Sequence, residues 1–337
     1  MTFDHLVADF SKLTGIFFYT DDILGFVSAA EGFVLLSGFV CAAAYLPLLA
    51  QGREKEAQAR VVRRLVKIYL AQIILAFLYI FFIAAKLPEA DHFPWARLAP
   101  AALLKEFALA MALLCQPQYV DILPLYFLFS LVTLPALQLM RRGHENAVIF
   151  LSLVLWLASQ FLPYGHVHGS IIFPFFNPLA WQFLFIIGLV LGCAHVRSGS
   201  WRAVFPESRE QLWRIISWCV VILCLGLKFW EHSHVDMMIH EKGPLSPLRL
   251  LDTLCAGVVL AGLSDLLPVS RWENWLSLLG RRSLYVFFWS TSLICFGLLL
   301  QPRLAGFGLP AQAGIFVLML MSLAVPAWRT QVKKNVV

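Results

Sequence analysis

The chain has 337 residues, of which 60% are hydrophobic and only 14% are charged, and its net charge is +6 at pH 7. Ordinary soluble domains contain about 25% charged residues, so this composition excludes a water-soluble globular protein and predicts that lipid surrounds most of the chain. All seven cysteines lie in or beside apolar segments, which indicates buried thiols rather than disulfides or a metal site. We expect an all-α integral membrane protein, because helices pair their own backbone groups within lipid.

Long apolar runs predict nine complete transmembrane helices, since about 20 mostly apolar residues cross the hydrocarbon. In chain order they cover residues 26–49, 65–87, 122–140, 146–163, 179–196, 212–230, 250–267, 282–300 and 311–328. MTFDHLV at the start resembles the outer end of a further helix, which makes about ten transmembrane helices with the first one truncated. We expect residues 1–330 to form one membrane domain and residues 331–337 a short cytoplasmic tail. LLKEFALAMALL (103–114) predicts a helix lying at the outer surface.

The Lys and Arg residues predict the orientation of the chain, because cytoplasmic loops are enriched in them. Of the 26 basic residues, eighteen lie in or beside the loops of one side, which includes the C-terminus. The other side holds Lys12, Lys86, Arg97, Lys105, Lys228, Lys242, Arg249 and Arg303. We therefore place the C-terminus in the cytoplasm. These loops account for the positive charge, and no nucleic-acid partner is expected.

Two acidic residues near the outer ends of predicted helices are candidates for function, since ionisable residues within membrane spans are costly. Glu31 lies in SAAEGFVLLSGF on a mostly small helix face that lets another helix approach closely. There it would meet a partner such as His5 or an arginine. Asp121 begins the span of QPQYVDILPLY, with Tyr126 one turn further on. Helix capping is an alternative explanation for Asp121.

A third group opens the span of NPLAWQFLF. Asn177 is a plausible N-cap before Pro178, whereas Gln182, next to Trp181, needs a hydrogen-bond partner within an apolar run. Two neighbouring outer loops, residues 163–178 and 231–247, hold five of the nine histidines together with aromatic residues. An outer surface with these side chains suits the binding of a sugar. An aromatic belt at the membrane interface explains the same residues equally well.

On the cytoplasmic side, RVVRRLVKIY places Arg60, Arg63, Arg64 and Lys67 at helical spacing, and Arg281 and Arg282 follow in LGRRSLYVFFW. Such clusters commonly only obey the positive-inside rule. They can also hold the phosphates of a nucleotide-bearing donor. The phosphate-binding, hydrolase and metalloprotease motifs of soluble enzymes are absent from the sequence.

Taken in order, MTFDHL, SAAEGFVLLSGF, RRLVKIYLAQ, QPQYVDILPLYF, NPLAWQFLFIIGLVLG and LGRRSLYVFFW resemble the OpgC family of periplasmic glucan succinyltransferases, within the acyltransferase 3 superfamily. The resemblance spans most of the chain, and AAEGFVLLSGF, YVDILPLY and NPLAWQFLF are its most specific pieces. It implies a ten-helix enzyme of the bacterial inner membrane. Such an enzyme passes an acyl group from a cytoplasmic donor such as succinyl-CoA to glucose hydroxyls of periplasmic glucans, with no bound cofactor and no metal.

The resemblance also implies roles for residues. The family's first-helix histidine falls on His5, while the arginine eleven positions before it has no counterpart in this sequence. That departure fits a truncated first helix, and otherwise it puts the activity of this chain in doubt. The family's acid falls on Glu31, and its basic segment on Arg63 and Arg64. We expect Lys67, Arg281 and Arg282 to join in donor binding, and Asp121, Tyr126, Trp181 and Gln182 to contact the acceptor.

The predicted mechanism uses His5 as general base toward a glucose hydroxyl, oriented by Glu31. Asp4 is a weaker candidate for that orienting acid, since consecutive helix positions point about 100° apart. Direct attack on the thioester is expected, and an acyl-enzyme on a serine or on Cys41 stays open. A transporter or flippase that uses Glu31 and Asp121 as proton-linked sites is the alternative function, although no internal symmetry supports it. A catalytically inactive relative is a further alternative.

Overall fold

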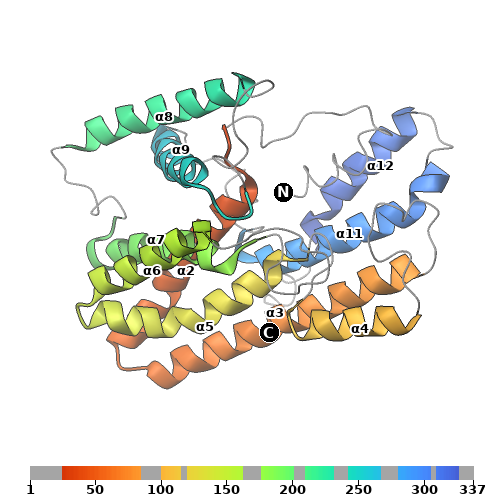
Figure 1. The fold of residues 1–337 in the computed structure, drawn as a ribbon, viewed down its shortest axis with the longest axis horizontal. Helices are drawn as coiled ribbons and strands as arrows, with labels where there is room; N and C mark the ends of the chain where they lie inside the picture. The colour runs from red at the N-terminus through yellow and green to blue at the C-terminus, as the bar shows by residue number, and fades with distance from the viewer. Residues whose placement is uncertain are drawn as a thin grey trace, which may run out of the picture. The chain divides into compact units, whose positions relative to one another are not determined.

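The computed structural model describes residues 25–84, 100–114, 120–161, 176–200, 209–230, 242–266, 280–304 and 309–325. Every regular element within these ranges is a helix (Figure 1). His5, the predicted first helix and the predicted C-terminal tail lie outside the described residues. The all-helical prediction therefore holds for the part of the chain that the structure describes.

Each of the nine predicted spans overlaps a described helix. These helices are α2 (Ala29–Ala50), α3 (Glu54–Ala84), α5 (Ile122–Arg141), α6 (Glu145–Phe161), α7 (Pro178–Ser198), α8 (Glu210–Trp230), α9 (Pro247–Leu266), α11 (Ser283–Leu304) and α12 (Leu309–Ser322). Their bounds differ from the predicted ones, most of all at the start of α3. By length and composition, four of the described helices can cross a membrane: α2, α5, α7 and residues Glu210–Lys228 of α8. Shorter apolar helices occur at Glu145–Phe161, Ser283–Gly297 and Pro310–Ser322. The apolar helices support a membrane protein, and the total of about ten spans stays a prediction.

The chain divides into two compact units. One consists of Met1–Thr20, Ala71–Val120 and Leu267–Val337, and the other, called the central unit below, consists of Asp21–Leu70 and Asp121–Leu266. In the central unit α2 packs along α7, α6 also packs on α7, and α5 contacts all three of these helices (Figure 1). α8 packs mainly on α9, through a small cluster centred on Val221 and Val259.

The α2–α7 interface is unusually close because glycines form it. A Cβ added to Gly38 would collide with the carbonyl oxygen of Phe185, and one added to Gly188 would collide with that of Leu35. Gly192 is similarly enclosed by the backbone of Phe39. The predicted small face of α2 is therefore confirmed, and the helix that approaches it is α7.

Helices of the central unit alternate in direction, and side chains tie their ends together. At one end, called the basic end, Arg141 of α5 donates to the carbonyl of Leu49 in α2 and to Glu54 of α3. Arg197 of α7 pairs with Glu145 of α6 at 2.8 Å at this same end.

At the opposite end, the turn before α9 is fixed by buried tryptophans. Nε1 of Trp181 lies 3.0 Å from the carbonyl oxygen of Gly243, and Nε1 of Trp156 lies 3.0 Å from that of Leu245. Gln160 donates to the carbonyl of Pro244 at 2.9 Å. This grouping of helix ends agrees with the alternation that the basic loops predict.

The other unit contains α4 (Pro100–Met111), which overlaps the surface helix predicted at 103–114. α4 packs on the second half of α3, where Phe107 meets Phe77 edge to face with ring centroids 6.0 Å apart. Leu103 and Phe107 cover a small core that includes Ala76 and Ile80. The helix is confirmed, and its placement at the outer surface stays a prediction.

Candidate functional site

Glu31 is fully buried in the first turn of α2, and both oxygens of its carboxylate have partners. Oε2 accepts hydrogen bonds from the backbone N–H and from the hydroxyl of Ser28. Oε1 lies 3.3 Å from Nη1 of Arg249 in α9. The predicted arginine partner is therefore present. Because a buried carboxylate without a cation is costly, this ion pair offsets part of the cost of burying Glu31 in the helix bundle.

Asp252 is a second fully buried carboxylate at the same end of the central unit, one turn beyond Arg249. Its Oδ2 accepts a hydrogen bond of 2.8 Å from the N–H of Phe26, and its Oδ1 has no hydrogen-bond partner within the described ranges. Gly25 has a φ of +68° and lies so close that a Cβ there would fall 2.6 Å from Oδ2. A glycine is therefore required at this turn both for its backbone conformation and for space.

Glu31, Arg249 and Asp252 form what we call the α2–α9 charge cluster. Arg249 pairs with Glu31 and acts on Asp252 through its charge, and Nε of Arg249 is also without a hydrogen-bond partner among the described residues. The cluster thus retains one free donor and one free acceptor, a combination that matches a hydroxyl group. Sequence reasoning missed Arg249 and Asp252 as site residues. The available signal was PLRLLDTL, which places two ionisable residues three positions apart at the start of a span.

Asp121 is the N-cap residue of α5, but its side chain makes no capping hydrogen bond. Backbone N–H groups of Asp121 and Ile122 nevertheless interact with this carboxylate, so the helix N-terminus stays an alternative explanation for the acid. Burial raises the pKa of Asp121 to about 7, and the positive charge of Lys242 opposes the rise. Near neutral pH the carboxyl group is consequently able to donate as well as to accept hydrogen bonds.

The other residues predicted to contact an acceptor have partners inside the protein. Trp181 is fully buried and holds the turn before α9. The amide of Gln182 donates to the carbonyl of Ser152 at 2.8 Å and accepts from the hydroxyl of Ser152 at 2.6 Å. Asn177 caps α7 by accepting from the N–H of Leu179, as predicted. Gln182 thus has the partner that its apolar setting required, and its contact with an acceptor stays a prediction.

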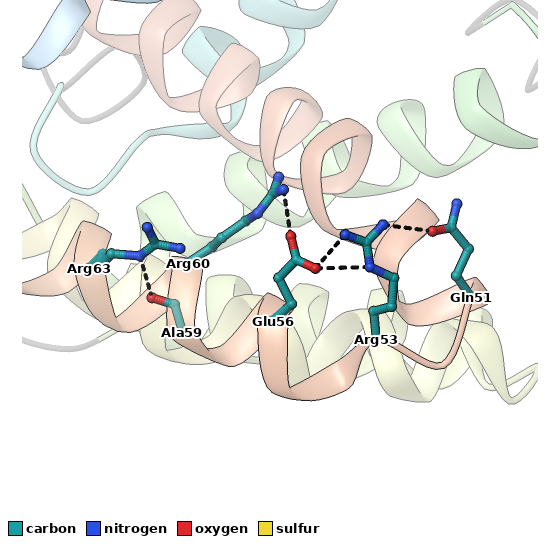
Figure 2. A network of polar contacts seen from close by, with 6 residues as sticks. All are labelled: Gln51, Arg53, Glu56, Ala59, Arg60 and Arg63. Atoms are coloured by element: carbon teal, nitrogen blue, oxygen red, sulfur yellow. Dashed lines mark hydrogen bonds and ion pairs between the residues drawn. The ribbon is translucent and has the colours of Figure 1, made fainter.

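At the basic end, the first turns of α3 carry a network of exposed ion pairs (Figure 2). Glu56 lies between Arg53 and Arg60 and pairs with both. Hydrogen bonds from Arg60 and then Arg53 lower the pKa of Glu56. Arg63 instead donates from Nε to the carbonyl of Ala59, at 3.2 Å, and has no carboxylate partner in the described part of the chain (Figure 2). Its terminal nitrogens therefore remain available for an anion such as a phosphate.

Arg64 points in a different direction from its neighbour. Its Nη1 lies 2.8 Å from Sγ of Cys41, and its Nη2 lies 2.9 Å from Oγ of Ser37, both in α2. Tyr45 hydrogen-bonds to this guanidinium, and Tyr126 interacts with it through charge alone. Arg63 and Lys67 are exposed, whereas Arg64 is partly buried. Arg60, Arg63 and Lys67 are thus exposed at helical spacing, whereas Arg64 turns toward α2.

The remaining predicted site residues lie outside the central unit or outside the described residues. Arg281 and Arg282 directly precede α11, where Arg281 is exposed and Arg282 is partly buried. They belong to the other unit, so their joint action with Arg63 stays a prediction. His5 lies outside the described residues.

Comparison with known proteins identifies the family. A family model described as "OpgC protein" matches residues 1–335, which is nearly the whole chain. No curated protein and no solved structure matches the sequence significantly. The wider acyltransferase 3 grouping stays a prediction. The chain belongs to the OpgC family, and together with its apolar helices this membership indicates an OpgC-type membrane acyltransferase.

Proposed function

We propose that this protein is a membrane O-acyltransferase that moves a succinyl group from cytoplasmic succinyl-CoA to glucose hydroxyls of periplasmic glucans. The observation that carries the proposal is the family match over residues 1–335. The bacterial inner membrane is the location that this proposal requires, with the basic end of the central unit in the cytoplasm.

In the proposed reaction the oxygen of a glucose hydroxyl forms a bond to the thioester carbonyl carbon, and the carbon–sulfur bond of the donor breaks. His5 takes the hydroxyl proton as general base, and that proton passes to the departing thiolate of coenzyme A. Glu31 supports His5 as the acid of the pair. The products are a succinyl ester of the glucan and free coenzyme A, so no oxidant and no metal enters the reaction.

The chemistry at the two ends of the central unit supports a donor on one side and an acceptor on the other. At the basic end Arg63 is exposed and unpaired with any described carboxylate, which suits the phosphates of coenzyme A. At the opposite end the α2–α9 charge cluster and Asp121 offer hydrogen-bonding groups that suit a sugar.

Direct transfer is favoured over an acyl-enzyme on Cys41. The neighbours of its thiol are Arg64, Ser37 and Thr133, and no imidazole or carboxylate of the described residues hydrogen-bonds to it. A guanidinium stays protonated at any physiological pH and cannot serve as the base that such an intermediate needs.

Mass spectrometry of periplasmic glucans tests the proposal. Cells lacking the gene are complemented with the intact gene, with His5→Ala, or with His144→Ala, which alters an exposed histidine at the start of α6. We expect succinyl-sized mass increments on glucans from the intact and His144→Ala strains and none from the His5→Ala strain. If glucan mass does not depend on the gene, the acyltransferase proposal fails, and a transporter or flippase becomes the better hypothesis.

A further inference from the structure

Six described arginines of the central unit pair with carboxylates: Arg53, Arg60, Arg141, Arg197, Arg214 and Arg249. Arg63, Arg64, Arg142 and Arg209 have no such partner within the described ranges, and of these four only Arg64 is not exposed. Within the described ranges no carboxylate pairs with Arg64. Its hydrogen bonds go to a thiol and a hydroxyl. The guanidinium is therefore a cation held by neutral groups.

The position of the Arg64 side chain makes the lack of a carboxylate partner energetically costly. Arg64 directly precedes the predicted span of residues 65–87, but its side chain reaches Ser37 and Cys41, which lie inside the predicted span of residues 26–49. A cation at such depth is expensive unless an anion accompanies it, and intramembrane cations commonly mark a substrate pathway. Arg64 is thus a cation without an anion among the described residues, and we expect a bound ligand to supply that anion.

We propose that Arg64 binds the distal carboxylate of a dicarboxylic acyl group and so selects succinyl over uncharged acyl groups. This inference rests on the proposed function, because it concerns the donor of that reaction. Succinyl differs from butyryl chiefly in carrying a carboxylate at the far end of the same four-carbon chain. Only the charged chain supplies the anion that Arg64 lacks.

The geometry around Arg64 suits the replacement of its present acceptors by a carboxylate. Its Nη1 and Nη2 donate to Cys41 and Ser37, which are weak acceptors compared with a carboxylate. A planar guanidinium and a carboxylate form two parallel charge-assisted hydrogen bonds. The Ser37 hydroxyl and the Tyr45 phenol, which already hydrogen-bond with Arg64, are donors for the remaining lone pairs of that carboxylate.

The same observations separate the role of Arg64 from that of Arg63. Arg63 is exposed and suits a phosphate that stays in water, whereas Arg64 is partly buried between α2 and α3. We therefore assign nucleotide recognition to Arg63 and acyl recognition to Arg64. The two adjacent arginines of RRLVK would then bind different parts of one donor, its phosphates and its acyl carboxylate.

The experiment measures kcat/KM with succinyl-CoA and with butyryl-CoA on the full-length protein in nanodiscs, with a glucan acceptor. Wild-type protein should prefer succinyl-CoA, and Arg64→Gln should lower the ratio of succinyl to butyryl transfer by roughly 10- to 100-fold. Arg64→Lys, which keeps the charge, should restore part of the ratio. Arg63→Gln should raise KM for both donors to the same extent, and Arg142→Gln, at an exposed basic-end position, should leave the ratio unchanged.

The outcomes distinguish this inference from the proposed function. If wild-type protein uses both donors equally, or if Arg64→Gln lowers both to the same extent, the assignment of Arg64 is wrong while acyl transfer stands. If wild-type protein transfers neither group, the proposed function itself fails. The comparison of donors on wild-type protein needs no substitution, so it decides the question even if Arg64→Gln does not fold.

Discussion

At the scale of single residues, Glu31 and Arg249 depend on each other. Both side chains are almost completely removed from solvent, with 0% and 11% of their surfaces exposed, and neither finds another described ion-pair partner. Removing one partner of a buried ion pair leaves the other charge uncompensated, whereas replacing both can be nearly neutral.

We therefore expect Arg249→Met to destabilise the protein by about 3–5 kcal/mol. The double substitution Glu31→Gln with Arg249→Met should recover most of that loss, because the carboxylate that Arg249 neutralises is then removed as well. Thermal unfolding followed by circular dichroism in detergent measures both effects. Equal destabilisation by the single and double variants would show that the pair is not coupled.

The sequence predicted some of these residues and not others for physical reasons. Glu31 stands out because it is an acid inside an apolar run, and its small helix face indicated a close partner. Arg249 and Asp252 lie near a predicted helix end, where charges are common, so only the contacts across α2 and α9 reveal their burial. Arg64 and Arg63 are neighbours in the chain, and sequence spacing alone did not show which of them turns inward.

At the scale of elements, the approach of α2 to α7 depends on glycine positions rather than on hydrophobicity. Gly38 and Gly188 bring each helix against the backbone of the other, which in lipid replaces the hydrophobic effect with close packing. Hydropathy located both helices, but it could not pair them, because every apolar helix of the chain has much the same composition. The glycines predicted a close approach without naming the partner.

Substitution of two glycines in α2 tests this interface. Gly38→Ala should destabilise the protein by about 1–3 kcal/mol, since the added methyl group overpacks against the backbone of α7. Gly32→Ala is the matched control, because a Cβ at Gly32 meets no atom within 4 Å. It should be neutral or stabilising by up to about 1 kcal/mol through helix propensity. Unfolding temperatures in detergent give the comparison, and equal effects at both positions would contradict the packing argument.

At the scale of the whole molecule, the central unit has two chemically different ends. One holds the exposed cations of α3, α5 and α7, and the other holds the charge cluster and the turn that Trp156 and Trp181 fix. The count of basic residues per loop predicted this division, because the bias acts on whole loops. It could not predict which side chains would tie the helix ends together, since those contacts join residues far apart in the chain.

Reporter fusions test which end faces the cytoplasm. We expect green fluorescent protein fused after Ser200, near the C-terminal end of α7, to fluoresce, and alkaline phosphatase fused after Lys242, before α9, to be active. Each reporter should be silent at the other position, because phosphatase folds only outside the cytoplasm and fluorescent protein exported unfolded stays dark. The reverse pattern would invert the predicted orientation and move the donor side to the other end.

The long separation between Glu31 and Arg249 has a consequence for biosynthesis. The two residues are 218 positions apart in the sequence. Phe26, whose backbone N–H bonds to Asp252, is separated from that residue by 226 positions. The ribosome therefore delivers an acidic helix long before it delivers the arginine that neutralises it. Until α9 has emerged, the nascent chain carries an acid in α2 without this partner. The contacts at the N-terminal end of α2 therefore form only after α9 has been made. A chain interrupted before α9 leaves Glu31 without Arg249, and membrane quality control can recognise such an unpaired acid.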